Sequence, residues 1–364
     1  MNARLLAARR TAIVPRGGAF ARLLPHELAA PVIRAALADA GLGPQDVGEV
    51  ILSNALGAGG NLARVASLAA GLPERVAGLT IDRQCAGGLD ALLLADALVR
   101  AGVYDVVVAG GVESYSRRPQ RLRTDPDGGP AVPYDQAPFT PWPDRDPGMA
   151  EAADRLGREL RIDRAAQEAW AAESHRKALA AGPAPGMVPL HGVAADPFAR
   201  RLTPRLLARA RPVRGAVTVA TMAVAADAAA VCVVASPRAA AALGRTGPAI
   251  LSGATLGGAP DLPGLAPVAA GRAALAAAGL NADDLARAEI MEAFAVQAIA
   301  CVHGLGLRPH IVNPDGGALA RGHPVGASGA VLAVDLFHGL APGEAGLAAI
   351  AAAGGIGTAL VLRA

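Results

Sequence analysis

The order of apolar and polar positions repeats in two distant segments of the chain. From Pro31, the run PVIRAALADAGLGPQDVGEVIL spaces its apolar residues three and four positions apart and continues with an acidic turn and an apolar stretch, which predicts a helix followed by a strand. From Pro267, the run PVAAGRAALAAAGLNADDLARAEIM has the same order. Ala-Gly-Leu closes both helices, since glycine can take the left-handed conformation after a helix end. The two glycines, Gly41 and Gly279, lie 238 positions apart (279 minus 41), which indicates an internal duplication.

The duplication also relates a cysteine to a histidine. The same spacing of 238 takes Cys85 to His323, and each begins a run of small residues that predicts a helix entered from a loop, CAGGLDALLLADALVRAG and HPVGASGAVLAVDLFHG. Another matching pair, VVVAGGVES from Val106 and AAAGGIGTA from Ala351, predicts strands that end in Gly-Gly turns. Two halves related by a pseudo-twofold axis would bring the two helix starts to one cleft. We expect the functional site there.

Between the halves the pattern changes. The run from Arg117 to Gly148 is rich in Pro, Asp and Gly and predicts an irregular excursion, and AAQEAWAAESHRKALAAG after it predicts a helix with an apolar face. We therefore expect an N-terminal half of residues 1–117 plus 225–245, a loop domain of residues 118–224 and a C-terminal half of residues 246–364. The run RTAIVP from Arg10 is expected to be the first strand.

Composition and charge narrow the class of protein. The 364 residues can bury a large core, and the 52% hydrophobic content is raised by alanine rather than by one long apolar run, so we expect no membrane span. The N-terminus lacks a secretory pattern, and the three cysteines have neither disulfide nor metal spacing, which favours a cytoplasmic protein without a metal site. A net charge of +3 is too small to indicate a nucleic-acid partner. Six arginines between Arg200 and Arg214 are either a solvated surface or a site for a phosphorylated ligand.

Cys85 has the surroundings of a reactive thiol. A cysteine at a helix start has its thiolate stabilised by the helix dipole and by free backbone N–H groups, which lowers its pKa. Gly87 and Gly88 allow a ligand or another backbone to approach, and a nearby imidazole such as His323 could take the thiol proton. A lone cysteine is more often a buried inert thiol, and a loop histidine is more often only hydrogen-bonded. Their symmetry-related placement favours the functional interpretation.

The other two cysteines, Cys232 and Cys301, lie within apolar runs and are expected in the core.

These motifs resemble the thiolase family over nearly the whole chain. The matching runs are IDRQCAGGLDAL, VVVAGGVES, EAFA, NPDGGALARGHPVGASGA and AAAGGIGTA. The resemblance implies an α/β fold of two βαβαβαββ halves, packed as five layers (αβαβα), with an inserted loop domain over the site. It implies homodimers or homotetramers. It also implies acyl transfer between coenzyme A and a cysteine, with a coenzyme A thioester (or an acyl-carrier thioester) as substrate and no tightly bound cofactor.

The same resemblance implies roles for single residues. Cys85 is the acylated nucleophile, and His323 activates it and helps to stabilise the enolate oxygen. Backbone N–H groups of Cys85 and of the turn at Ala353 and Gly354 form an oxyanion hole. The remaining positions are expected in the substrate pocket (Met149, Met291 and Phe294) and near the nucleotide end of coenzyme A (Arg209 and Arg211).

The sequence departs from the family at three places. Ala351 stands where the family has a second cysteine that moves the Cα proton of the acetyl group. Met291 stands where an asparagine anchors the water of an oxyanion hole, and a thioether has no donor. The segment Ala220–Ala228 replaces a Gly-Asn-Ala-Ser-Gly run that contacts coenzyme A, and only Asp227 is retained. None of these changes removes the group that is acylated, so acylation of Cys85 is the better-supported half-reaction.

Two functions follow from this pattern. The first is a thiolase-like acyltransferase that passes the acyl group to coenzyme A, to a carbon nucleophile activated by decarboxylation, or to another acceptor such as an amine, an alcohol or water. The second is a degenerate, half-active or non-catalytic homologue that binds acyl chains or pairs with an active partner. A nucleotide-binding regulator is disfavoured because no glycine run has phosphate-loop spacing.

Overall fold

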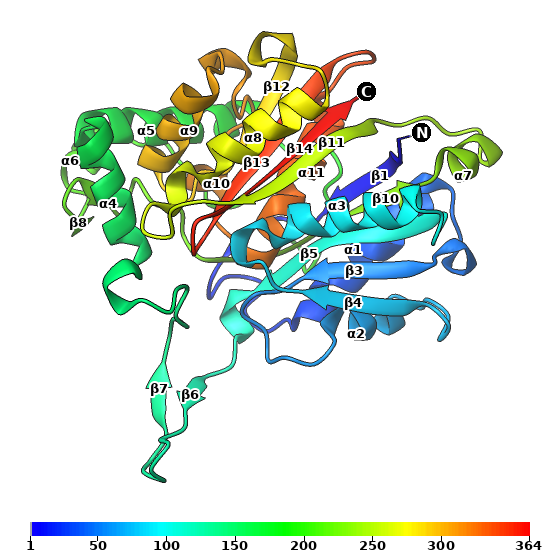
Figure 1. Cartoon of the computed structure of the whole chain (residues 1–364), viewed down its shortest axis with the longest axis horizontal. Helices are drawn as coiled ribbons and strands as arrows, with labels where there is room; N and C mark the ends of the chain where they lie inside the picture. Colours follow the sequence, from blue (N-terminus) through cyan, green and yellow to red (C-terminus); the bar gives the residue numbers. More distant parts are fainter. Residues whose placement is uncertain (1) are drawn as a thin grey trace.

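The computed structural model describes residues 2–364, and its N-terminal half is a mixed sheet covered by helices (Figure 1). The strands are β1 (Arg4–Arg10), β3 (Glu49–Ser53), β4 (Ala77–Ile81), β5 (Val106–Ser114) and β10 (Ala226–Ala235), and the helices are α1 (Pro25–Ala40), α2 (Leu62–Ala69) and α3 (Gly87–Arg100). The strand order is β4-β3-β5-β10-β1. Strand β10 is antiparallel to both of its long neighbours, and β3 is parallel to β4 and β5. The short β2 (Val14–Pro15) also pairs with β10.

The C-terminal half repeats this arrangement. Its strands are β11 (Ala249–Gly257), β12 (Leu285–Ile290), β13 (Ala345–Ala352) and β14 (Ile356–Arg363), and its helices are α8 (Ala266–Ala277), α9 (Ala295–Leu305), α10 (Ala318–Arg321) and α11 (Ser328–Gly339). The order is β12-β13-β14-β11, with the same parallel and antiparallel pairings as the first half. The counterpart of β4 is reduced to one bridge between Ala288 and Val312. The duplication inferred from the sequence is confirmed.

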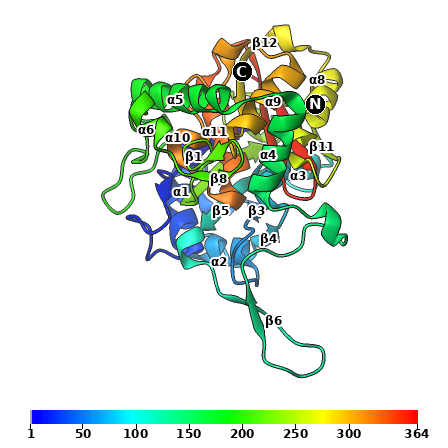
Figure 2. The same ribbon diagram turned by 90° about the vertical axis from the view of Figure 1, so that its left-hand side faces the viewer.

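The elements stack in the five expected layers. Helices α1 and α2 cover the outer face of the first sheet, α8 and α9 cover the outer face of the second, and α3 and α11 lie between the sheets (Figures 1 and 2). Three apolar cores fill the interfaces between these layers. The central helices approach closely, because a Cβ atom at Gly88 would lie 2.4 Å from the backbone nitrogen of Ala330. One pair, Arg4 with Ala249, joins the two sheets edge to edge.

The segment between β5 and β10 stands outside this core. It contains the hairpin β6 (Arg121–Arg123) and β7 (Val132–Tyr134), which projects from the body (Figure 1). It continues with α4 (Met149–Leu160), α5 (Arg164–Ala181), α6 (Pro204–Ala208), β8 (Pro212–Arg214) and β9 (Val217–Thr218). Helices α4 and α5 pack against α9 of the second half. The exact division at residues 118 and 224 stays a prediction.

The N-terminal strand and the connection between the two halves complete the fold. The first strand is Arg4–Arg10 and not the run from Arg10 to Pro15, because Thr11–Ile13 leave the ladder before β2 begins. Helix α7 (Pro237–Ala242) connects the two halves after β10. Among residues 2–364, no helix is both long and apolar enough to cross a membrane.

Candidate active site

Cys85 and His323 line one cavity of about 360 Å³. Cys85 lies in the single turn Gln84–Ala86 that leads from β4 into α3, and His323 lies in the loop before α11, the equivalent helix of the second half. Gln84 has a left-handed backbone (φ 50°), and Asp82 accepts a hydrogen bond from its N–H over 2.8 Å. Such a conformation costs of order 1 kcal/mol in a residue other than glycine and is concentrated at functional sites. The predicted convergence of the two helix starts is observed.

The proton positions on His323 follow from its neighbours. Ser328 Oγ donates its single hydrogen to the carbonyl oxygen of Pro324 over 3.0 Å, and it lies 2.7 Å from Nδ1 of His323. A hydroxyl whose hydrogen is already used can only accept there, so Nδ1 carries the imidazole hydrogen. The free lone pair is therefore on Nε2, which lies 3.2 Å from Cys85 Sγ. His323 is oriented to take the thiol proton of Cys85.

Burial keeps this pair neutral at rest. It raises the pKa of the Cys85 thiol to about 12, and the negative charges of Glu113 and Asp82 act in the same direction. Burial also lowers the pKa of His323 to about 4. The expectation that the helix start lowers the pKa of Cys85 is wrong, because removing the thiolate from water outweighs the backbone N–H group that stabilises it. Proton transfer to His323 must therefore accompany attack on a substrate.

Glu113, near the end of β5, forms hydrogen bonds to two loops of the site, the loop after β3 and the loop that contains His323. Its carboxylate accepts hydrogen bonds from Asn54 Nδ2 over 2.8 Å and from the backbone N–H groups of Ala55, Leu56 and Gly326 over 3.1, 3.3 and 3.0 Å. Gly326 is three residues after His323, so one buried carboxylate joins the loop after β3 to the histidine loop. Burial raises the pKa of Glu113 to about 7, against the effect of these backbone donors.

Glu292, in the run EAFA, fixes two parts of the chain to each other in the same way. Glu292 accepts hydrogen bonds from Trp170 Nε1, Ser174 Oγ and Asn313 Nδ2 over 3.0, 2.7 and 2.9 Å. Trp170 and Ser174 belong to α5, so the carboxylate fastens the loop domain to the second half. Two positions further along the chain, Phe294 enters the cavity wall.

The substrate-pocket residues expected from the sequence separate into two groups. Met149, the first residue of α4, lines the Cys85 cavity together with Phe294. Met291 does not. Its side chain is 1% exposed and borders a separate cavity of about 20 Å³ beside Glu289 and Ser328. Its N–H donates to the carbonyl oxygen of Ala349, which holds the residue in the core at the end of β12.

The turn expected to form an oxyanion hole lies at the cavity. Ala353 lines it with Ala351 and Ala352, and Gly354, the next residue, lies just outside the lining with a left-handed backbone (φ 76°). Within residues 2–364, the backbone N–H groups of Cys85 and Gly354 donate no hydrogen bond to the backbone. These unpaired donors suit an incoming oxyanion.

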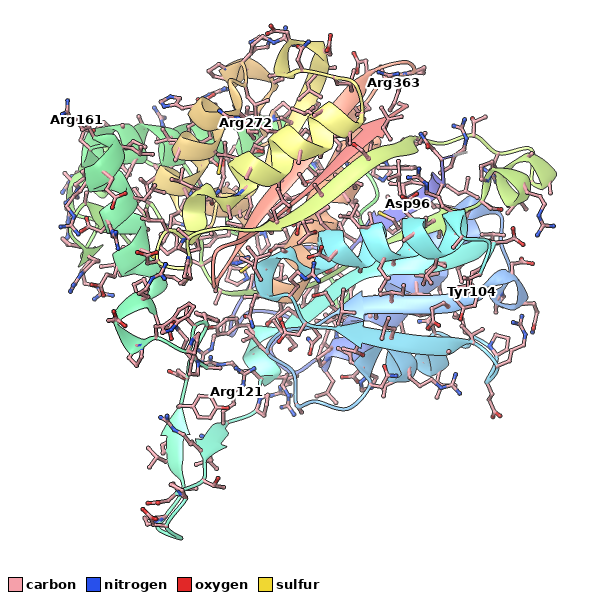
Figure 3. All side chains as sticks on the ribbon, in the orientation of Figure 1. Asp96, Tyr104, Arg121, Arg161, Arg272 and Arg363 are labelled. Carbon is pink, nitrogen blue, oxygen red and sulfur yellow. The ribbon has the colours of Figure 1, made fainter. Side chains whose placement is uncertain are left out.

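The position of Arg209 and Arg211 near the nucleotide end of coenzyme A stays a prediction. Arg209 and Arg211 are exposed between α6 and β8 and do not line the Cys85 cavity. The guanidinium groups that do line it belong to Arg118 and Arg121, and Figure 3 shows Arg121 where the β6–β7 hairpin leaves the body. Asp227 holds this region, because it accepts hydrogen bonds from both the N–H and the hydroxyl of Ser116.

Sequence reasoning missed both cavity arginines. Their position directly after the strand VVVAGGVES was the available signal, since sites in α/β sheets gather at the carboxyl ends of parallel strands.

Comparisons with known proteins agree along the whole chain. Residues 4–238 match a family model described as thiolase, N-terminal domain, and residues 246–364 match thiolase, C-terminal domain. An acetyl-CoA acetyltransferase from Cupriavidus necator is 37% identical, with 99% of this chain and 98% of that protein covered.

Two solved structures are also similar. Acat5 thiolase from Ascaris suum in complex with coenzyme A has a TM-score of 0.93 and 30% identity, with both chains fully covered. The acetyl-CoA acetyltransferase of Bacillus anthracis has a TM-score of 0.90 and 33% identity, covering 99% of this chain and 98% of that one.

Proposed function

Since the chain belongs to the thiolase family, we propose that it is an acyl-CoA C-acyltransferase that carries its acyl group on Cys85. The observation that supports this most directly is the 3.2 Å contact between Cys85 Sγ and the free Nε2 lone pair of His323. The similarity to named acetyl-CoA acetyltransferases supports a coenzyme A thioester as the substrate. The complex of the Ascaris suum relative with coenzyme A supports the same ligand.

Acylation then follows from the geometry. The Cys85 sulfur attacks the thioester carbonyl while its proton passes to His323 Nε2. The oxygen of the tetrahedral intermediate accepts hydrogen bonds from the backbone N–H of Cys85 and from the turn at Ala353 and Gly354. The bond from carbon to the coenzyme A sulfur breaks, and His323 passes its proton to the departing thiolate, which leaves as the thiol.

The cavity wall favours an apolar acyl chain. Met149 and Phe294 line it beside Phe139, Leu156 and Met222. Coenzyme A is also highly charged at its nucleotide end, which suits arginine. Arg118 and Arg121 are the nearest candidates for its phosphates, and the exposed pair Arg209 and Arg211 remains a second candidate on the loop domain.

Intact-protein mass spectrometry tests this function. The full chain is incubated with a panel of acyl-CoA donors of increasing length, and we expect a mass increase of one acyl group that is absent from Cys85→Ala. Cys232→Ala is the matched control and should still be acylated, because Cys232 is fully buried in β10 and does not line the cavity. The proposal fails if no donor acylates the wild-type protein, or if the adduct persists in Cys85→Ala.

A further inference from the structure

The Cys85 cavity offers one usable proton acceptor. The ionisable side chains lining it are Cys85, Tyr115, Arg118, Arg121, Asp135 and His323. Arginine stays protonated at any working pH, and the neutral tyrosine hydroxyl is a poor base. Asp135 has a 91% exposed side chain and pairs with Arg118 over 3.2 Å, so it is a solvated carboxylate that already has a cationic partner. Among the described residues that line this cavity, His323 alone is positioned to hold a proton beside Cys85.

The end of β13 contributes only methyl groups to the same cavity. Ala351, Ala352 and Ala353 all line it, and β13 packs on the turn that contains Cys85. Condensation with an unactivated thioester requires a base to remove a proton from its α-carbon. An alanine side chain cannot take that proton. The Nε2 atom of His323 faces the Cys85 sulfur, and burial lowers the pKa of this imidazole to about 4, so it is a weak base for a Cα proton. The site therefore lacks the second proton acceptor that such a condensation needs.

We propose that the partner of acylated Cys85 is a thioester with a carboxylate on its α-carbon, of the malonyl class, and that loss of carbon dioxide creates the attacking carbanion. This inference rests on the proposed acylation of Cys85. In this reaction the breaking of a carbon–carbon bond takes the place of the removal of a Cα proton. The protein then needs no base other than the one it has.

The atoms and charges balance with a single histidine. In the first step His323 passes the proton of Cys85 to the departing coenzyme A thiolate, which leaves as the thiol. In the second step the bond between Cα and the carboxylate breaks, carbon dioxide leaves, and the electron pair attacks the acyl carbon. The bond from that carbon to Cys85 then breaks, and the departing sulfur takes a proton from water, which leaves one hydroxide ion. The products are a 3-oxoacyl thioester, carbon dioxide and free coenzyme A.

The surroundings suit this chemistry. A carboxylate placed against the methyl groups of Ala351–Ala353 loses its hydration, and a neutral product such as carbon dioxide is then favoured over the buried anion. Arg118 and Arg121 at the cavity attract an anionic thioester before it reaches this apolar wall.

The test separates this inference from the acylation on which it rests. The protein is first acylated with the most effective donor, freed of small molecules and checked by intact mass. It is then mixed with malonyl-CoA labelled in its free carboxyl group, or with acetyl-CoA, and released labelled carbon dioxide and 3-oxoacyl-CoA are measured in one turnover. We expect condensation with malonyl-CoA to be about 10²–10⁴ times faster than with acetyl-CoA, the usual contribution of a general base.

Each outcome decides one claim. Acylated protein that releases no carbon dioxide above the Cys85→Ala background overturns the decarboxylative reaction and leaves the acyl-enzyme intact. Equal rates with malonyl-CoA and acetyl-CoA also overturn it, because they would reveal a second base. Failure of acylation overturns both proposals.

Ala351→Cys provides an independent check. A thiol at this position can take a Cα proton, so we expect this variant to gain condensation with acetyl-CoA. It should also gain exchange of the acetyl-CoA methyl protons with deuterated water, for which we expect little or none in the wild-type protein. Rapid exchange in the wild-type protein would contradict the absence of a second base.

Discussion

Ser328 Oγ accepts a hydrogen bond from His323 Nδ1 over 2.7 Å and donates to the carbonyl oxygen of Pro324 over 3.0 Å. This relay assigns the imidazole tautomer without reference to any substrate. It leaves the Nε2 lone pair for Cys85, and it anchors the histidine to the first turn of α11, whose backbone is fixed by the core. Ser328 is therefore a positioning residue that acts through His323.

Removal of this hydroxyl is expected to slow acylation. In Ser328→Ala the imidazole can rotate or take the other tautomer, and the loss of one hydrogen bond of about 1 kcal/mol corresponds to a rate about five-fold lower. Ser328→Thr keeps the hydroxyl and should retain most of the rate. The acylation rate, followed by quenching and intact mass, checks this. Equal rates for the alanine and threonine variants would show that the hydroxyl does not position His323.

Selective alkylation tests the accessibility of the three cysteines. Cys85 is half-buried at the cavity, whereas Cys232 and Cys301 are fully buried in the core. Iodoacetamide should therefore modify Cys85 first in the folded protein, and an acyl-CoA that acylates it should protect it. Peptide mapping identifies the modified residue. Earlier modification of Cys232 or Cys301 would contradict the structure of the site.

The protonation state of Cys85 gives a separate pH prediction. Burial raises the pKa of its thiol to about 12, so the thiolate is absent below that pH and increases only as the pH approaches it. A difference spectrum between the wild-type protein and Cys85→Ala should show no thiolate absorbance from about pH 6 to about pH 9, where an ordinary cysteine with a pKa of about 8.5 would titrate. A thiolate signal near neutral pH would instead indicate a resting thiolate–imidazolium pair.

Glu113→Gln is expected to destabilise the fold at the site. The Glu113 carboxylate accepts four N–H donors, two on each oxygen. Glutamine has the same shape, but its NH₂ group must face two of those donors in either orientation. Two unsatisfied buried donors cost about 2–4 kcal/mol, which urea unfolding would measure. Glu159→Gln, in an exposed pair with Arg155, is the matched control and should change stability by less than about 0.5 kcal/mol. A similar effect of both variants would contradict the network.

The sequence predicted the duplicated architecture and the cysteine–histidine pair because both depend on backbone periodicity. Helix ends at Gly41 and Gly279 are local features, and symmetry then brings Cys85 and His323 together. The pKa of Cys85 was predicted in the wrong direction, because desolvation depends on every layer packed around the turn. Met291 was misplaced for a related reason, since a motif gives a position in the chain and not the direction of a side chain. Arg118 was missed because it follows the strand outside any motif.

The free edge of β4 predicts a homodimer. Within residues 2–364, β4 pairs only with β3, so its other edge has unpaired backbone groups. Leu79 on this strand is 40% exposed, and Val65 and Leu68 of the adjacent α2 are 46% and 45% exposed. Antiparallel pairing of two β4 strands across a twofold axis would satisfy these backbone groups and cover the apolar side chains. Because Cys85 follows β4 by four residues, the same contact would steady the turn that contains it.

Analytical ultracentrifugation of two charge variants checks this interface. The wild-type protein should sediment as a dimer or a larger symmetric assembly at micromolar concentration. Leu79→Glu places like charges opposite each other across the proposed axis and should shift the protein towards a monomer with slower acylation of Cys85. Val103→Glu is the matched control, because Val103 is 55% exposed but lies in the turn before β5, away from that edge. A monomeric wild-type protein, or equal dissociation of both variants, would rule out the β4 edge as the interface.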